Sequence, residues 1–177
     1  MKRLPNVVPM LAAAWLLLPH TLHAAPPEVK VAPANPMIDM PGYLRVSEEA
    51  AKHRLSRRVS EDEFLRMRGE PRTIVLDARS RDRYDDLHVD GAVHLDFADI
   101  TIESLARLIP DRDTRVLIYC NNNFTGAEKA FPGKIARASL NLSTFIALYS
   151  YGYRNVYELA PTLDVRHTMI PLVPTPR

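Results

Sequence analysis

The fold of this chain is decided by the stretch Arg115-Val-Leu-Ile-Tyr-Cys120-Asn-Asn-Asn-Phe124, which contains the only cysteine of the sequence. Residues 116–119 form an apolar, β-prone run that is too short for a helix and is typical of a strand buried on both faces. Cys120 stands at the carboxyl end of that run, where the chain turns polar. In open parallel α/β sheets, ligands bind just outside the carboxyl ends of the strands.

This position of Cys120 allows two interpretations. A thiol that is followed by a loop and then by a helix can meet the loop amides and the positive end of the helix, and both favour the thiolate. Alternatively, Cys120 is a small core residue that ends its strand by chance, because lone buried cysteines are common.

The rest of the chain alternates between segments that are typical of strands and segments that are typical of helices. We predict strands near 57–59, 73–77, 115–119 and 155–159, and residues 88–95 as a turn that leads into a short strand. We predict helices at 47–54 with Ser47 as cap, at 60–68 with Ser60 and Glu63 as a capping box, and near 81–87, 102–109 and 138–150. This alternation predicts one α/β domain with a parallel sheet of about five strands and helices on both faces.

The first 25 residues have the pattern of a secretory signal peptide. Lys2 and Arg3 form a basic start, residues 7–18 form an apolar core, and Ala24-Ala25 offers small residues for cleavage. The apolar run is too short to span a bilayer, although an uncleaved anchor is the alternative. We therefore expect a mature periplasmic protein with no membrane attachment after cleavage.

Charge gives no case for a nucleic-acid partner. The whole chain carries a formal charge of +2, and Lys2 and Arg3 are the only charged side chains of the predicted leader. The mature chain would therefore be neutral overall, which argues against nucleic acid or an anionic membrane as a partner. Export also bears on Cys120, because a single thiol in an oxidising compartment is open to modification unless it is buried or used.

Four marks in this order resemble the rhodanese-like domain. They are the strand Thr73-Ile-Val-Leu-Asp-Ala-Arg79, the turn His88-Val-Asp-Gly-Ala92, the strand Val116-Leu-Ile-Tyr-Cys120, and the final helix and strand with Gly152-Tyr-Arg-Asn-Val-Tyr157. On this resemblance we divide the chain into a signal peptide (1–25), a proline-rich arm and short helix (26–56), a rhodanese-like domain (57–165) and a tail (166–177).

The resemblance implies a sulfurtransferase that carries sulfane sulfur as a persulfide. Cys120 would be the nucleophile, and Asp77, Arg79 and His88 would hold the scaffold around it. A small sulfur-containing donor would load the thiol, and a thiol or cyanide-type acceptor would take the sulfur, with no cofactor. The loop that holds the persulfide would begin with Asn121, Asn122, Asn123, Phe124 and Thr125.

The chain departs from the family pattern directly after the cysteine. The family closes a short loop into the next helix, whereas here an inserted loop at 121–136 separates the two. No arginine follows Cys120 before Arg137, which disfavours the related phosphatases, because these need an arginine fork close behind the cysteine. Lys129, Lys134 and Arg137 could bring positive charge to the thiol, and we expect Arg137 to be the best placed of the three.

The inserted loop keeps other functions open. The first alternative is a catalytically silent module of this fold that binds a protein or a small anion at the inserted loop. A weaker third possibility is a thiol-based redox or metallochaperone role. We expect no metal site, because the histidines show no ligand spacing, and we expect a monomer.

Overall fold

The computed structural model describes residues 35–176, so the predicted leader and most of the proline-rich arm lie outside the described residues. From Met37 onward the chain forms one compact unit. Its helices are α1 (Met40–Arg54), α2 (Glu61–Arg68), α3 (Arg81–Asp86), α4 (Ile102–Leu108) and α5 (Leu140–Ser150), with short 3-10 helices η1 (Phe97–Asp99), η2 (Asn121–Asn123) and η3 (Ala136–Ala138). None of the described helices is long and apolar enough to cross a membrane.

The centre of the unit is a five-stranded parallel sheet, as predicted. Its strands are β1 (Arg58–Val59), β7 (Val156–Leu159), β5 (Arg115–Tyr119), β2 (Thr73–Asp77) and β4 (Val93–His94), in that spatial order. All four pairings are parallel. The cysteine strand β5 is therefore the middle strand, and it is buried along residues 116–119, as a strand covered on both faces must be.

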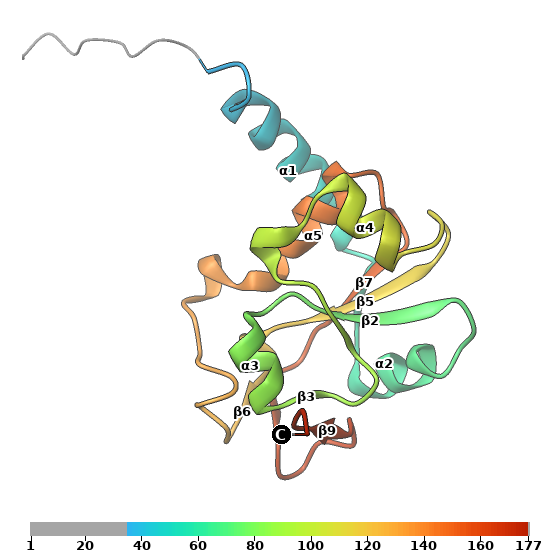
Figure 1. Ribbon diagram of the computed structural model, residues 1–177, viewed down its shortest axis with the longest axis vertical. Coiled ribbons are helices and arrows are strands. Elements are labelled where there is room, and N and C mark those ends of the chain that lie inside the picture. The colour runs from blue at the N-terminus through green and yellow to red at the C-terminus, as the bar shows by residue number, and fades with distance from the viewer. Residues whose placement is uncertain (1–34, 177) are drawn as a thin grey trace, which may run out of the picture. The chain divides into compact units, whose positions relative to one another are not determined.

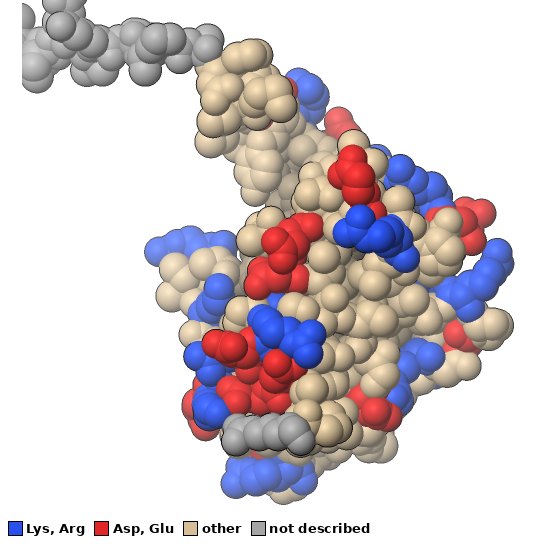
Figure 2. Space-filling view, viewed as in Figure 1, with Lys and Arg blue, Asp and Glu red and all other residues tan. Residues whose placement is uncertain are grey.

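Helices cover both faces of the sheet and give it two apolar cores (Figure 1). On one face, Ala50 of α1, Leu105 of α4 and Phe145 of α5 pack against alternate residues of β5 and β7. On the other face, Phe64 of α2 packs with the remaining side chains of the same strands and with Phe131 of the inserted loop. Figure 2 shows basic and acidic side chains interspersed over the face drawn there, without a large patch of one sign.

Helix α1 is longer than the sequence suggested. We predicted that it begins at Ser47, but it begins at Met40, and the Asp39 carboxylate caps it by accepting the Gly42 N–H at 2.9 Å. Pro41 does not prevent this, because the first turn of a helix needs no N–H from that residue. Ser47 lies inside the helix, where its hydroxyl donates to the Tyr43 carbonyl at 2.6 Å.

The predicted cap of helix α2 is confirmed, but its capping box is not formed. Ser60 caps α2 by accepting the Glu63 N–H at 3.3 Å, as predicted. Glu63 does not reach back to complete a capping box, because its carboxylate is bound to Arg66 instead.

The segment after β7 adds two short strands to the fold. Strand β8 (Leu163–Asp164) pairs with β6 (Phe124–Thr125), and strand β9 (Leu172–Val173) pairs antiparallel with β3 (His88–Val89). Between them Ile170 is only 2% exposed and belongs to the apolar core. The tail is therefore part of the folded unit.

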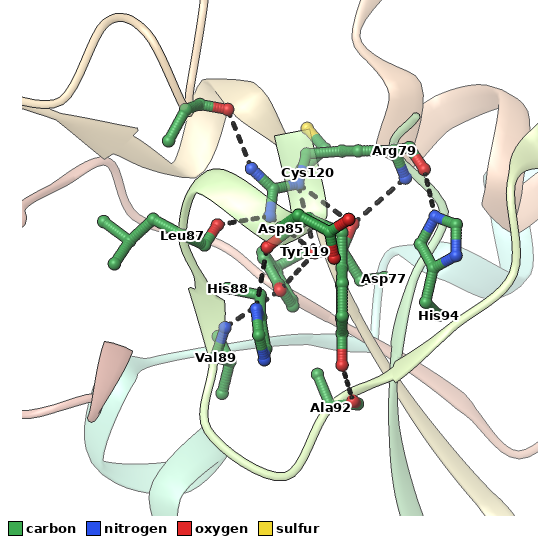
Figure 3. A network of polar contacts seen from close by, with 12 residues as sticks. Asp77, Arg79, Asp85, Leu87, His88, Val89, Ala92, His94, Tyr119 and Cys120 are labelled. Atoms are coloured by element: carbon green, nitrogen blue, oxygen red, sulfur yellow. Dashed lines mark hydrogen bonds and ion pairs between the residues drawn. The ribbon is translucent and has the colours of Figure 1, made fainter. Parts of the chain in front are cut away.

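A buried polar network stands at the carboxyl end of β2 (Figure 3). Asp77 and Arg79 form a bidentate pair, with Arg79 Nη2 at 2.6 Å from Asp77 Oδ2 and Nε at 2.9 Å from Oδ1. Their side chains are 0% and 1% exposed. The Tyr119 hydroxyl donates to Asp77 Oδ2 from the neighbouring strand, because Asp77 and Tyr119 stand opposite each other in the β2–β5 register.

The same network ties two segments to the sheet, the inserted loop and the chain that follows α3. Arg79 Nη1 donates to the Ala130 carbonyl of the inserted loop at 2.9 Å, and Nη2 donates to the Leu87 carbonyl at 2.8 Å. The Val89 N–H donates to the Tyr119 hydroxyl at 3.0 Å. The guanidinium also lies over the Phe131 ring, 4.3 Å from its centroid. One arginine thus satisfies buried carbonyls that the strands cannot reach.

Burial and charge set the ionisation of this network. Burial, followed by the negative charge of Asp77, raises the pKa of Tyr119 well above its ordinary value, so the phenol stays protonated and remains a donor. Burial by itself would lower the pKa of Arg79, but the hydrogen bonds and charge of Asp77 outweigh it, and the pKa is raised.

Replacing Arg79 by methionine should destabilise the domain strongly. The change leaves the Asp77 carboxylate buried without its cation, and breaking a buried pair in this way costs about 3–5 kcal/mol. The measurement is the free energy of unfolding from urea titration. Arg81→Met is the matched control, because the Arg81–Asp85 pair is largely exposed and should contribute little. Equal stability of the two variants would contradict a supporting role for the network.

The Tyr119 phenol should make the domain sensitive to alkali. The unfolded chain releases this proton near its ordinary pKa of about 10, whereas the folded chain holds it to higher pH. The stabilisation is therefore complete below about pH 10 and is lost as pH rises through the folded pKa. Between about pH 9 and pH 11, the free energy of unfolding should fall more steeply for the wild type than for Tyr119→Phe. Parallel pH profiles would show that Tyr119 does not titrate differently in the two states.

Candidate active site

Cys120 lies at the carboxyl end of the central strand, between the ends of β7 and β2. It is 1% exposed, and its Sγ is 3.4 Å from the Ser139 Oγ. Ser139 directly precedes the eleven-residue helix α5, yet its hydroxyl makes no capping bond to the first turn. The sulfur therefore lies beside the N-terminus of a helix, where the helix dipole favours negative charge, and beside a hydroxyl that is free to donate to it.

A cavity of about 250 Å³ opens at this sulfur, and we call it the thiol pocket. Its wall combines the strand ends, the first turn of α5 and the junction between α1 and β1. It is lined by Arg54, Arg58, Cys120, Asn122, Asn123, Ala136, Ser139, Asn141, Leu142, Glu158, Ala160 and Thr162.

The thiol pocket carries one positive charge in excess. Arg54 is bound in a bidentate pair by Glu158, with Nη2 at 2.6 Å from Oε1, and Glu158 is 5% exposed. Arg58 stands opposite Glu158 in the β1–β7 register, but its side chain has no hydrogen bond or ion pair with any residue of the described chain. Its guanidinium is therefore available to an anion in the pocket.

The basic residue that the sequence favoured lies elsewhere. Arg137 is exposed in η3 and is not part of the pocket wall, although its neighbour Ala136 is. Sequence reasoning missed Arg54 and Arg58, which come from the end of α1 and from β1. One signal could have indicated Arg58: it lies on an outer parallel strand, and the carboxyl ends of parallel strands meet at one edge of the sheet.

The three asparagines after Cys120 have different surroundings. Asn123 is 4% exposed and bonds in four directions: its Oδ1 accepts from the Cys120 N–H and from Asn141 Nδ2, both at 2.9 Å, and its Nδ2 donates to the carbonyls of Leu159 and Pro161. Asn123 therefore fixes the cysteine relative to β7 and α5.

Asn122 anchors the inserted loop. Its Nδ2 donates to the Lys134 carbonyl at 2.7 Å, and its Oδ1 accepts from the Lys134 N–H at 3.1 Å. Asn121 is 5% exposed, and its Oδ1 is buried without a hydrogen-bond partner among the described residues. Asn121 does not line the thiol pocket.

Phe124 and Thr125 lie away from the thiol pocket. Phe124 is 2% exposed and packs against Tyr119 and Phe131, with ring centroids 5.9 Å and 4.7 Å apart. Thr125 pairs with Asp164 in the register between β6 and β8. From Phe124 onward the segment after the cysteine thus runs into the core, whereas the Asn123 N–H donates to the Cys120 side chain.

The other predicted supporting residues belong to the polar network. Asp77 and Arg79 hold the inserted loop through Ala130, as described above. His88 is 7% exposed, stacks on the Tyr84 ring at a centroid distance of 3.7 Å, and has its Nδ1 2.7 Å from the Tyr84 carbonyl. Among the described residues no group of three or more His, Cys, Asp or Glu could hold a metal ion.

Comparison with solved structures finds proteins with the same type of domain. A rhodanese with anions from E. coli is 23% identical, with 58% of this chain and 98% of that chain covered and a TM-score of 0.39. A thiosulfate sulfurtransferase from Pseudomonas aeruginosa is 22% identical, with 68% and 20% covered and a TM-score of 0.45. A complex of EanB with hercynine is 16% identical, with 66% and 27% covered and a TM-score of 0.47. A search of curated proteins found no match.

The family model for the rhodanese-like domain matches residues 60–160, which is more than half of the chain. The matched region begins at the cap of α2, ends just after β7, and includes both the cysteine strand and the inserted loop. Four of the five sheet strands and the strand-end cysteine lie within it, and the chain belongs to the rhodanese-like domain family.

Proposed function

We propose that this chain is an exported sulfurtransferase that carries sulfane sulfur on Cys120. The observation that carries the proposal is the position of Sγ, at the wall of a pocket, beside Ser139 and the N-terminus of α5. A thiol becomes an effective nucleophile as the thiolate, and a helix N-terminus and a hydroxyl donor both stabilise that form.

The chemistry consists of two exchanges at sulfur. The Cys120 thiolate attacks the outer sulfur of thiosulfate, a new S–S bond forms, the original S–S bond breaks, and sulfite leaves with the bonding electrons. A thiolate or cyanide then attacks the outer sulfur of the persulfide, and the Cys120 thiolate is regenerated. Both leaving groups depart as anions, so no proton has to be supplied for either bond cleavage.

The persulfide would be held differently from the family pattern. We assign the stabilisation of the charged sulfur to the Asn123 N–H, the Ser139 hydroxyl and the first turn of α5. Arg58 supplies a free positive charge at the pocket wall, and we propose that it attracts the anionic donor.

The burial of the thiol favours a second candidate function. Cys120 is only 1% exposed, as it would be in a module that binds a partner without transferring sulfur. The two candidates differ in the fate of Cys120, because only the carrier forms a persulfide.

Export is likewise a proposal, based on the leader pattern over residues 1–25, and amino-terminal sequencing of the periplasmic protein would test it.

Incubation with thiosulfate should add one sulfur to the protein. Intact mass spectrometry should show a gain of about 32 Da on the wild type, as covalent catalysis by a thiol requires, and none on Cys120→Ser. Cyanide should then remove the added mass. Failure of thiosulfate and of several other sulfane donors, with the protein folded and the thiol unmodified, would support the binding module instead.

Replacing Arg58 by glutamine should weaken the use of thiosulfate. We expect KM to rise about three- to tenfold with kcat little changed, since an exposed charge contributes part of the value of a hydrogen bond to an ion. Arg57→Gln is the matched control, because Arg57 bonds to the Tyr157 hydroxyl and does not line the thiol pocket. An equal effect of both changes would remove the proposed role of Arg58.

A further inference from the structure

A second cavity lies at the same edge of the sheet, on the β2 side of the cysteine strand. Its volume is about 340 Å³, within the range typical of small-molecule sites. We call it the Asn121 pocket. It is lined by Ala78, Arg79, Ser80, Arg83, Asp96, Phe97, Asn121, Pro132, Lys134 and Leu140, and Cys120 is not among these residues.

Asn121 places an unpaired polar side chain at this pocket. Its exposed fraction is 5%, its Oδ1 is buried without a hydrogen-bond partner, and its Nδ2 makes no hydrogen bond within the described chain. A buried amide without a partner is costly, about 1–3 kcal/mol for each unsatisfied group. Asn123, two residues on, makes four hydrogen bonds. The unpaired amide of Asn121 therefore contrasts with the full pairing of its neighbour.

Two side chains of opposite charge on the pocket wall, Asp96 and Lys134, also have no ion-pair partner among the described residues. The carboxylate of half-buried Asp96 accepts only the Ala98 N–H, at 3.1 Å, and forms no ion pair in the described part of the chain. The Lys134 ammonium has no partner there either, while its backbone is held in place by the side chain of Asn122. By contrast, the second basic group on the wall, Arg83, is already bound to Asp86 and to the Lys129 carbonyl.

The inserted loop builds one side of this pocket. Arg79 holds the Ala130 carbonyl and Arg83 holds the Lys129 carbonyl, at 2.9 Å and 2.6 Å, so the loop is fixed to the domain just before Pro132. Asn122 fixes it again at Lys134. Pro132 and Phe97 add apolar wall between the charged groups. Lys134 is thus held at the cavity wall by contacts of its own backbone and of the loop residues before it.

We propose that the Asn121 pocket binds a small zwitterion, a free amino acid or a dipeptide. Asp96 would bind its ammonium group, Lys134 its carboxylate, and the Asn121 amide would pair with a polar group between them. Unpaired charges of both signs favour this class over a simple anion, which Asp96 would repel. The proposal does not depend on the sulfur chemistry, since Cys120 lines the other pocket.

Titration of the folded domain with glycylglycine tests the proposal. The Cys120→Ser variant is used, so that the outcome is independent of persulfide formation. In ¹H–¹⁵N NMR spectra we expect saturable shifts of the Asn121 side-chain amide and of the backbone amides near Asp96 and Lys134. The absence of saturable shifts at these positions would overturn the proposal.

Variants that remove one charge, combined with ligands that are blocked at one end, identify which residue binds each end of glycylglycine. Asp96→Asn keeps a capping oxygen for η1 but should weaken glycylglycine about tenfold, the loss expected for one hydrogen bond to a charged group. It should leave the weak binding of N-acetylated glycylglycine unchanged. Lys134→Gln should weaken glycylglycine similarly and leave its carboxyl-terminal amide unchanged. Equal effects on the blocked and unblocked ligands would contradict the proposed contacts.

Two further variants complete the test. Lys129→Gln is the control within the inserted loop, because Lys129 pairs with Asp86 outside the Asn121 pocket, and it should bind like the parent. Asn121→Leu should raise the melting temperature, because it removes an unpaired buried amide, and should weaken glycylglycine binding. Unchanged binding by Asn121→Leu, or a loss with Lys129→Gln equal to that with Lys134→Gln, would overturn the proposal.

Discussion

The buried pair of Asp77 and Arg79 is the interaction on which the functional edge of the sheet depends. A parallel sheet leaves the loops at its carboxyl edge without strand partners, so their buried carbonyls need donors from side chains. Arg79 supplies donors to Leu87 before the β3 turn and to Ala130 in the inserted loop, while Asp77 balances its charge. Tyr119 joins this pair to the cysteine strand itself. The position of Cys120 thus depends on charges buried one strand away.

A second fixed point is Asn123, which replaces the short loop of the family. In this chain the residues after the cysteine form one 3-10 turn, from which the Asn123 N–H donates to the Cys120 side chain, and they then enter the core as β6. The Asn123 side chain bonds to the Cys120 amide, to α5 through Asn141, and to the end of β7. The sulfur is thereby placed against Ser139 and the start of α5, so the helix N-terminus adds to the one amide that the turn supplies.

The long insertion consequently has a structural explanation. It is fixed to α3 and to the polar network at residues 129–131, and to Asn122 at Lys134. Between these points it forms a wall of the Asn121 pocket, which lies on the opposite side of the strand end from the thiol pocket. Consecutive residues, Cys120 and Asn121, therefore face different cavities, as the alternation of side chains at a strand end allows.

The sequence by itself determined the sheet, because apolar runs buried on both faces are visible without partners. Residues 73–77 and 115–119 have the strand bounds that their composition predicts, and the alternation of strands and helices gave the parallel fold class. The cysteine at the strand end and the motif order were likewise readable. The start of α1 was not, because Pro41 looked like part of an extended arm although it fits the first helical turn.

Only the tertiary structure decided what surrounds the thiol. Arg54 and Arg58 reach the thiol pocket because β1 pairs with β7, a contact between residues a hundred positions apart that no local pattern encodes. Arg137, although close to α5 in sequence, points outward, because it precedes the helix in an exposed 3-10 turn. The separate environments of Asn121, Asn122 and Asn123 also depend on distant backbone groups. The sequence shows which chemical groups are present, but tertiary packing determines which charges and amides pair with one another.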